Sequence, residues 1–350
     1  MQPHRHPDVA AEVGAAQARV ITSPDEFAAA VALLDTLEEA AGVPLVDEAE
    51  RHRLGQQGVG GAGGNHEHWH ALLSGPANAP PDGYAGILLL PGSTEVVGDV
   101  AVARDRPCGD PLEALLIALG GLAVAHGASH ALVWVRHAGV NDLACAQRVG
   151  WTPDRRLDVL AFDVRPGDDP PQVDPTAGNA GQAAVLPDGL RLRAWAGPDD
   201  DEQVAQLLAA AYAETPEAGW TAADVATRRA LPWFDAADLL LAVDDDDSVM
   251  GVHWTKRRDA TTGEVYNLAV HPQAQGTGLG RALLHVGVDH LANHGATTVL
   301  LWVDRDNHAA AQLYRRFGFE LAWTDLALRL RSGQSPSVDD SRRVPGGTTL

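Results

Sequence analysis

The sequence has only two cysteines, Cys108 and Cys145, among 350 residues. Two thiols make neither a disulfide framework nor a CxxC motif, which fits a reducing compartment. The sequence also lacks any run of about 18 apolar residues, so it predicts no membrane-spanning helix. Its first residues, MQPHRHPDVAAEV, contain no apolar segment of the kind that a signal peptide requires. These features together predict a cytoplasmic protein.

Positive charge is scarce as well. There are 26 Lys and Arg residues against 47 Asp and Glu, which gives a formal net charge of −21 and an isoelectric point near 4.9. A nucleic-acid-binding protein needs a basic surface, and so does a protein that binds anionic lipid. We therefore expect neither nucleic acid nor a membrane as a partner.

Length and composition predict two domains with ordinary apolar cores, since 45% of the residues are hydrophobic. Residues 165–189 are rich in Pro, Gly and Asp and predict a linker between a domain at 17–164 and a domain at 190–330. Residues 1–16 and 331–350 have no sustained apolar period, so we expect both to be disordered.

The two halves of the chain are similar to each other when they are aligned 168 positions apart without a gap. His126–Val135 (HGASHALVWV) then aligns with His294–Val303 (HGATTVLLWV), and Ala146–Trp151 (AQRVGW) aligns with Tyr314–Phe319 (YRRFGF). A repeat of this length indicates a duplicated domain rather than a solenoid, whose repeats are much shorter.

Each copy has the pattern of an α/β (α+β) domain. In the C-terminal copy, strand-like apolar runs alternate with segments of helical period, and the acidic stretch Asp244–Asp247 predicts a solvated hairpin turn. The predicted helices are 201–213, the segment after Gly280, and 307–318; the predicted strands are 237–244, 248–257, 264–272, 297–304 and 320–330.

The segment Gln275–Arg281 (QGTGLGR) places three glycines at the start of an apolar helix. The unpaired N–H groups and partial positive charge of a helix N-terminus favour an anion there. A P-loop would need Lys-Ser/Thr after Gly280, and a dinucleotide fingerprint would need glycine in place of Arg281. From these residues alone, an anion-binding loop and a glycine-rich turn without a ligand both remain open.

The context of this loop indicates a family. A strand that ends LAVHP precedes Gln275-x-x-Gly278-x-Gly280, and DNHAAAQLYRRFGFE follows about 26 residues later. This pairing resembles the GNAT superfamily of N-acetyltransferases, which bind acetyl-CoA. Over 194–330 the chain further resembles the mycothiol synthase family, as do its segments PEAGW (Pro216–Trp220) and PWFD (Pro232–Asp235). The resemblance implies two tandem GNAT domains, each a mixed, mostly antiparallel central sheet flanked by helices.

The resemblance also implies a reaction. The chain would be an N-acetyltransferase that moves the acetyl group of acetyl-CoA to the cysteinyl amine of desacetylmycothiol (Cys-GlcN-Ins), the last step of mycothiol biosynthesis, without a metal. We therefore expect a small-molecule partner and a monomeric chain. Two alternatives stay open: a tandem GNAT enzyme that acetylates another small amine or a protein N-terminus, and a non-catalytic, acetyl-CoA-binding regulatory protein.

Two residues carry the chemistry that the resemblance implies. An α-amine has a pKa near 8 and must lose a proton before it attacks a thioester, and Glu264 is the implied general base. Tyr314 is the implied acid that protonates the departing thiolate. From their own spacing, Glu264 would be a solvated hairpin residue and Tyr314 a core residue. Backbone N–H groups of Leu268, Ala269 and Val270, freed by an irregularity in the strand, are implied to stabilise the oxyanion.

The family also implies the binding residues. The implied coenzyme contacts are Leu268, Ala269, Val270, Gln275, Gly276, Thr277, Gly278, Leu279, Gly280, Arg281, Asn307, His308, Ala309, Ala310, Ala311 and Gln312. The implied substrate contacts are Glu67, Glu217, Lys256, Glu264 and Trp302. Trp302 stands where the family often has Tyr, so it offers an aromatic face without a hydroxyl.

The N-terminal copy lacks these features. The same shift places Val96 at the position of Glu264 and Ala146 at that of Tyr314. The glycine loop falls on Pro107–Leu112, where two prolines lack N–H groups and Asp110 would repel phosphate. We therefore expect this half to be degenerate and structural.

One motif in the N-terminal copy suggests a different chemistry. His66–His70 (HEHWH) matches the HExxH of zinc proteases, but it directly follows a glycine-rich loop rather than lying in a helical pattern. We expect a surface histidine cluster there and no metal site.

Overall fold

A computed structural model describes residues 12–13, 16–57, 69–75, 80–89, 94–103, 111–164, 186–212 and 219–331. The chain divides into two compact units: one combines the described residues up to Leu157 with those from Trp323 onward, and the other is Asp158–Ala322. Most of the predicted linker and both predicted tails lie outside the described residues, although Glu12–Val13 form a short strand.

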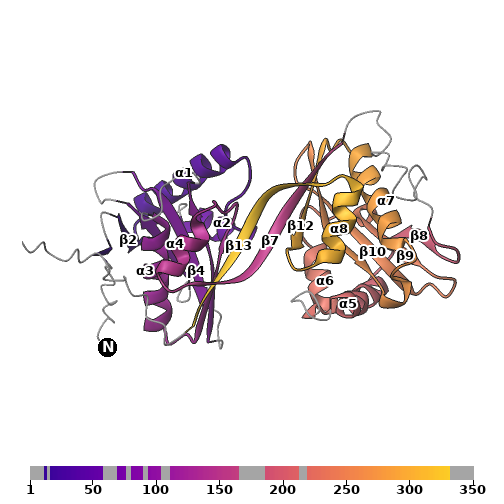
Figure 1. Ribbon diagram of the computed structural model, residues 1–350, viewed down its shortest axis with the longest axis horizontal. Coiled ribbons are helices and arrows are strands. Elements are labelled where there is room, and N and C mark those ends of the chain that lie inside the picture. Colours follow the sequence, from indigo (N-terminus) through magenta and orange to yellow (C-terminus); the bar gives the residue numbers. More distant parts are fainter. Residues whose placement is uncertain are drawn as a thin grey trace, which may run out of the picture. The chain divides into compact units, whose positions relative to one another are not determined.

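The first unit, drawn in Figure 1 from indigo to magenta with β13 in yellow, is a sheet in the order β1-β2-β3-β4-β5-β6-β13 with helices packed against it. All its neighbouring strands run antiparallel except β5 and β6. Its elements are β1 (Glu12–Val13), β2 (Ala16–Val20), α1 (Pro24–Ala41), α2 (Glu48–Gln57), β3 (Trp69–Ser74), β4 (Gly83–Leu89), β5 (Glu95–Val102), α3 (Pro111–Ala125), β6 (His130–Val135) and α4 (Asp142–Arg148).

The second unit has the strand order β7-β12-β11-β10-β9-β8, in which β11 and β12 run parallel. Its elements are β8 (Arg191–Ala194), α5 (Asp199–Ala211), α6 (Ala222–Arg229), β9 (Leu239–Val243), β10 (Val249–Arg257), β11 (Thr262–Val270), α7 (Leu279–Asn293), β12 (Thr298–Asp304) and α8 (His308–Phe317). The predicted fold class, a mixed sheet flanked by helices in each copy, is therefore confirmed. Helix α6 was not predicted, although Thr221 and Asp224 form a capping box at its start.

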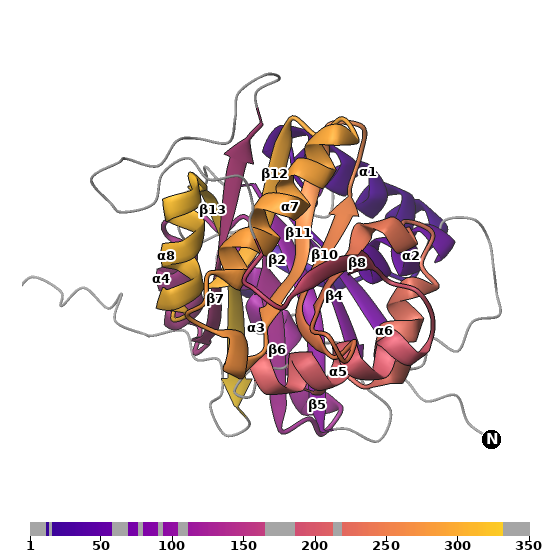
Figure 2. The ribbon, with the colours of Figure 1, turned by 90° about the vertical axis from the view of Figure 1, so that its right-hand side faces the viewer.

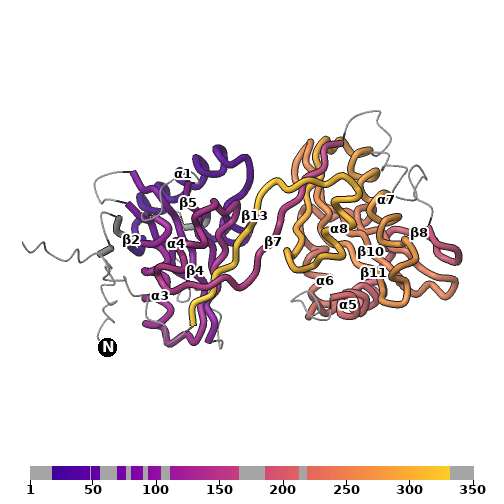
Figure 3. Tube along the Cα trace, in the orientation of Figure 1, coloured from indigo at the N-terminus to yellow at the C-terminus, as the bar shows by residue number. Residues whose placement is uncertain are grey.

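The last strands of the two copies are exchanged. β7 (Thr152–Asp163) and β13 (Glu320–Arg331) lie 168 positions apart, and each passes from one unit into the other, as the trace in Figure 3 shows. The end of β13 pairs with β6 from Leu326↔Val135 to Arg331↔His130. The end of β7 contributes Leu160 and Phe162 to the core of the second unit. Each unit is thus completed by the final strand of the other copy.

The sheet of the second unit carries an apolar core on each face. α7 packs across β10 and β11 (Figure 2), and together with α8 it covers a core that includes Val265, Leu301 and Val303. α5 and α6 cover a second core, which includes Leu241 and Trp254. Because side chains alternate along a strand, neighbouring residues of β11 and β12 belong to opposite faces.

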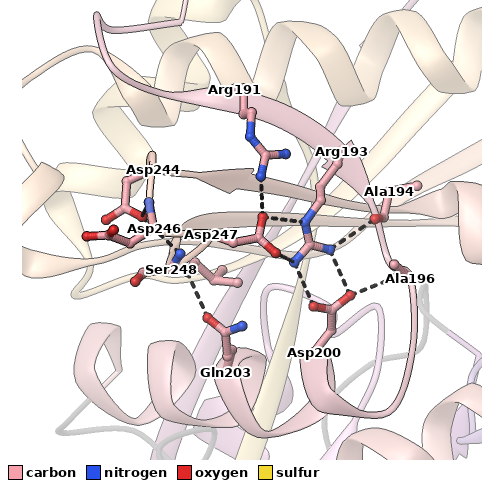
Figure 4. Close-up of polar contacts among 11 residues, drawn as sticks. Arg191, Arg193, Ala194, Ala196, Asp200, Gln203, Asp244, Asp246, Asp247 and Ser248 are labelled. Carbon is pink, nitrogen blue, oxygen red and sulfur yellow. Dashed lines mark hydrogen bonds and ion pairs between the residues drawn. The ribbon is translucent and has the colours of Figure 1, made fainter.

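The acidic turn Asp244–Asp247 anchors the edge strand β8 (Figure 4). Arg193 donates to Asp247 and makes two parallel hydrogen bonds to Asp200 on α5, at 2.7 and 2.8 Å. Arg191 also pairs with Asp247, whose carboxylate is therefore held between two guanidinium groups. The turn, predicted from its sequence as a solvated hairpin turn, is also a charged anchor for two arginines.

The described part of the chain includes no helix that is both long and apolar enough to cross a bilayer. Cys145, in α4, is disulfide-bonded. This differs from the expectation of a chain with reduced thiols.

A buried histidine fixes how closely α7 approaches the sheet. His253, on β10, is fully buried, and its Nδ1–H donates to the Leu283 carbonyl of α7 at 2.7 Å. Burial lowers the pKa of His253 to about 4, so the imidazole is neutral near pH 7. A Cβ atom at Gly287 would lie 1.9 Å from the imidazole Cε1, which is less than any real contact of that kind. Only glycine at 287 lets the helix pass over this ring.

We expect Gly287→Ala to lower the free energy of unfolding by about 1–3 kcal/mol, because the added methyl group overpacks a fully buried ring. Unfolding in denaturant, followed by circular dichroism, measures this change. Gly280→Ala, in the same helix, is the control, since its Cβ would meet Val270 at an ordinary 3.5 Å. Equal stability of the two variants would contradict the proposed clash.

Candidate active site

The parallel strands β11 and β12 separate part of the way along their length. They pair as far as Val265↔Leu301, but β11 continues to Val270 and β12 to Asp304 without further ladder pairs between them. Backbone groups that point from this part of β11 toward β12 therefore have no strand partner on that side. Such an opening in a sheet can take an extended ligand along its edge.

A β-bulge lies at the start of the separated stretch. On β10, Trp254 pairs with Asn267 and the next residue, Thr255, pairs with Val265, so Tyr266 is the extra residue of β11. A bulge bends its strand and re-aims the groups that follow it. Leu268, Ala269 and Val270, the predicted oxyanion residues, follow it after Asn267.

In the described part of the first unit, neither the bulge nor a separation of this length is present. Its parallel pair β5–β6 stays in register as far as Val100↔Val135, whose second-unit counterparts are Leu268 and Val303. The β4–β5 ladder shows no register shift. Val96 and Ala146, which stand where the second copy has Glu264 and Tyr314, are both buried in the apolar core.

The glycine loop leads into α7 through two left-handed residues. Gly276 has φ +77° and Gly278, the N-cap of α7, has φ +94°, a conformation that other residues rarely adopt. Thr277 Oγ1 donates to the Ala274 carbonyl at 2.7 Å and holds the turn. No side chain caps the helix, so its first N–H groups remain available to an anion.

Glu264 lies on β11 beside two cations and is 8% exposed. Its Cα partner across the ladder is Lys256 of β10, which is the single lysine of the whole sequence. Arg258 Nη1 donates to Glu264 Oε2 at 2.7 Å, and the guanidinium lies over the Trp302 ring, 5.3 Å from its centroid. The Lys256 ammonium lies 4.7 Å from the centroid of the Trp233 ring. The predicted substrate contacts Lys256, Glu264 and Trp302 are thus on one side of the sheet.

Tyr314 lies on the opposite face, in the core under α7 and α8. It is 7% exposed, and burial raises its pKa to about 12. The phenol therefore keeps its proton over the range in which thiols titrate. Val265, the neighbour of Glu264, shares this core, which places Glu264 on the other face. The unpaired stretch of β11 and β12 separates the two residues.

The helix α8 follows the end of β12 after a short turn. Its N-cap, Asn307, accepts a hydrogen bond from the Ala310 N–H at 3.1 Å. Ala311 faces the core, whereas Asn307, His308 and Ala309 are exposed. The predicted pantetheine contacts 307–312 therefore form the first turn and a half of a capped helix whose N-terminus is on the solvent side.

Several predicted residues cannot be placed, and one group of residues was missed. Glu67 and Glu217 lie outside the described residues, as does most of the HEHWH motif. Within the described residues, no group of three or more His, Cys, Asp or Glu could hold a metal ion. Sequence reasoning did not find Tyr212, whose hydroxyl donates to the Leu268 carbonyl at 2.7 Å. It also missed Arg258. Neither Tyr212 nor Arg258 belongs to a sequence motif, because each contacts its partner only once the chain has folded.

The second unit matches the Acetyltransferase (GNAT) family model over residues 203–319. Among solved structures, a GCN5-related N-acetyltransferase from Sphaerobacter thermophilus is similar at a TM-score of 0.61 and 20% identity, covering 91% of this chain and 96% of that one. A tandem GNAT protein from the clavulanic acid biosynthesis pathway is similar at a TM-score of 0.60 and 16% identity, covering 91% and 99%. These likenesses establish the fold.

Comparison with curated relatives identifies the family in addition to the fold. The chain is 37% identical to the mycothiol acetyltransferase of Nocardia farcinica over 84% of its own length and 91% of the relative's. It is 36% identical to that of Geodermatophilus obscurus over 87% and 94%. The chain therefore belongs to the mycothiol acetyltransferase family.

Proposed function

We propose that the second unit transfers the acetyl group of acetyl-CoA to the cysteinyl amine of desacetylmycothiol (Cys-GlcN-Ins). The observation that carries this proposal is the bulged, separated stretch of β11, which has Glu264 on one face and Tyr314 on the other. An amine that enters on the face of Glu264 would meet a thioester lying along this stretch. The family of the chain supports the same reaction.

We assign a separate step of the reaction to each of these groups. Glu264 accepts the proton that the ammonium form of the substrate loses, directly or through water. The amine then attacks the thioester carbon, and N–H groups of the stretch Leu268–Val270 stabilise the negative charge that develops on the oxygen. As the C–S bond breaks, Tyr314 gives its phenolic proton to the leaving sulfur; the nitrogen loses its remaining extra proton, which restores the phenol through solvent, and the products are the neutral amide and free coenzyme A.

The remaining contacts hold the two substrates. The backbone N–H groups of 275–281 suit the pyrophosphate, because glycine lets the anion approach the main chain closely. Residues 307–312 would line the pantetheine arm. Lys256 and Trp302 lie on the face that the amine enters, where a cation and an aromatic ring can contact a hydroxyl-rich substrate. Glu67 and Glu217 remain proposed contacts, and independence of metal remains a prediction.

The direct test is release of thiol from acetyl-CoA with Cys-GlcN-Ins as acceptor, beside simple amines, an aminoglycoside and a peptide with a free N-terminus. We expect kcat/KM for Cys-GlcN-Ins to exceed that of the other amines by at least about 10²-fold, since a site built for several hydroxyls loses its hydrogen bonds with analogues that lack them. The rate without acceptor is the control. Preference for another amine would leave the chemistry intact and reject the substrate, whereas coenzyme binding without turnover would favour a regulatory protein.

A further inference from the structure

The proposed base is already engaged in an ion pair. Glu264 Oε2 accepts a hydrogen bond from Arg258 Nη1 at 2.7 Å, and the two side chains are 11% and 26% exposed. A pair so nearly enclosed is screened less by water than a surface pair, so its geometry constrains both partners.

Hydrogen bonds in the turn between β10 and β11 fix the position of the Arg258 backbone. The Arg258 N–H donates to the Thr262 carbonyl at 2.9 Å. Asp259 Oδ1 accepts from the N–H groups of Thr261 and Thr262, each at 2.8 Å. The Thr261 carbonyl in turn accepts from the Thr297 N–H at 2.7 Å, which ties the turn to the start of β12.

Trp302 fixes the position of the Arg258 guanidinium group. The guanidinium lies over the indole ring at 5.3 Å, and a tryptophan face is the most favourable aromatic partner for a cation. The planar guanidinium can stack on the ring and donate in its own plane to the carboxylate at the same time, which an ammonium group cannot do. This arrangement uses the tryptophan that stands where the family often has tyrosine.

The groups around the carboxylate come from three elements. β10 brings Lys256 directly opposite Glu264, the turn brings Arg258, and β12 brings Leu300 as the ladder partner together with Trp302. Within the described residues, the charged neighbours given by the ladder and by the ion pair, Lys256 and Arg258, are both positive. Opposite charge beside a carboxylate favours its ionised form, which is the form that proton abstraction from an ammonium requires.

We propose that Arg258 is a positioning residue, which holds the Glu264 carboxylate ionised and in one orientation while Trp302 supports the guanidinium. This inference rests on the proposed function, because it gives Glu264 its role as base. It predicts that protonation of the substrate amine, and not protonation of Glu264, limits kcat/KM below neutral pH. Arg258 itself need not touch the substrate.

The test compares Arg258→Gln with Arg258→Lys in two measurements. The first is titration of the Glu264 carboxyl carbon by NMR of glutamate-labelled protein, assigned by the signal that is lost in Glu264→Gln. We expect Arg258→Gln to move this titration upward by about one pH unit or more, because the opposite charge is gone. Arg258→Lys should restore most of the shift. An unmoved titration would overturn the proposal whether or not the protein turns over.

The second measurement is the pH profile of kcat/KM. We expect Arg258→Gln to lower kcat by about 10²-fold, as for a misplaced catalytic group, and to add a second ionisation below neutral pH. Arg191→Gln, which breaks an exposed ion pair in the same unit, is the matched control and should keep the wild-type profile. Loss of rate in Arg258→Gln without the second ionisation would indicate a merely structural arginine. Failure of the wild type on every amine would reject the proposed function, while the NMR titration would still decide the role of Arg258.

Discussion

Replacement of Glu264 by Gln is expected to lower kcat by roughly 10²–10⁴-fold, the range for a positioned acid or base. Glutamine keeps the size and the hydrogen-bonding oxygen, but it cannot take a proton from the substrate ammonium. The measurement is thiol release at saturating concentrations of both substrates. Because Glu264 lies on the face opposite the α7–α8 core, coenzyme affinity should be unchanged, which a binding isotherm checks.

The isotherm should also give one coenzyme per chain. The β5–β6 ladder of the first unit stays paired as far as Val100↔Val135, so among the described residues only Ala101 and Val102 of β5 extend beyond it, whereas β11 leaves its ladder already after Val265. Glu202→Gln, an exposed glutamate on α5, is the control and should turn over normally. Turnover of Glu264→Gln close to that of the wild type would remove this residue from the mechanism.

Tyr314→Phe is expected to have a loss of similar size, roughly 10²–10⁴-fold in kcat. The substitution keeps the ring in the core with Phe317 and Phe319 and removes only the hydroxyl. Without it the thiolate leaves without a proton donor. Because burial raises the pKa of Tyr314 to about 12, the loss should be the same at pH 7 and at pH 9, and ionisation of this phenol should not limit the wild type below about pH 11.

The control for Tyr314→Phe is Tyr84→Phe, which removes the hydroxyl of another buried tyrosine, in the first unit. Circular dichroism and coenzyme binding of both variants separate loss of chemistry from loss of folding. A Tyr314→Phe protein that binds coenzyme and keeps wild-type turnover would show that the ring has a packing role only.

The sequence predicted the fold well where the signals are local. Strand and helix periods in the C-terminal copy place β9, β10, β11, β12 and α8 within a few residues of their observed bounds. The glycine loop is equally local, because left-handed backbone at 276 and 278 calls for glycine whatever the rest of the chain does. The family resemblance named Glu264 and Tyr314, while their own spacing left each with a bland alternative.

The sequence by itself determined the repeat, the two α/β copies, the lack of counterparts to Glu264 and Tyr314 in the first copy, and the family. Only the tertiary structure decided that β7 and β13 change places, that the bulge is at Tyr266, and that Arg258 meets Glu264 beside Trp302. The physical reason is the range of the interactions involved. Helix caps and turns depend on residues a few positions apart, whereas a ladder that ends early or a strand that changes sheets depends on partners far apart in the chain. β7 and β13 occupy the same position in the two copies of the repeat. The sequence of neither strand therefore indicates which of the two sheets it completes.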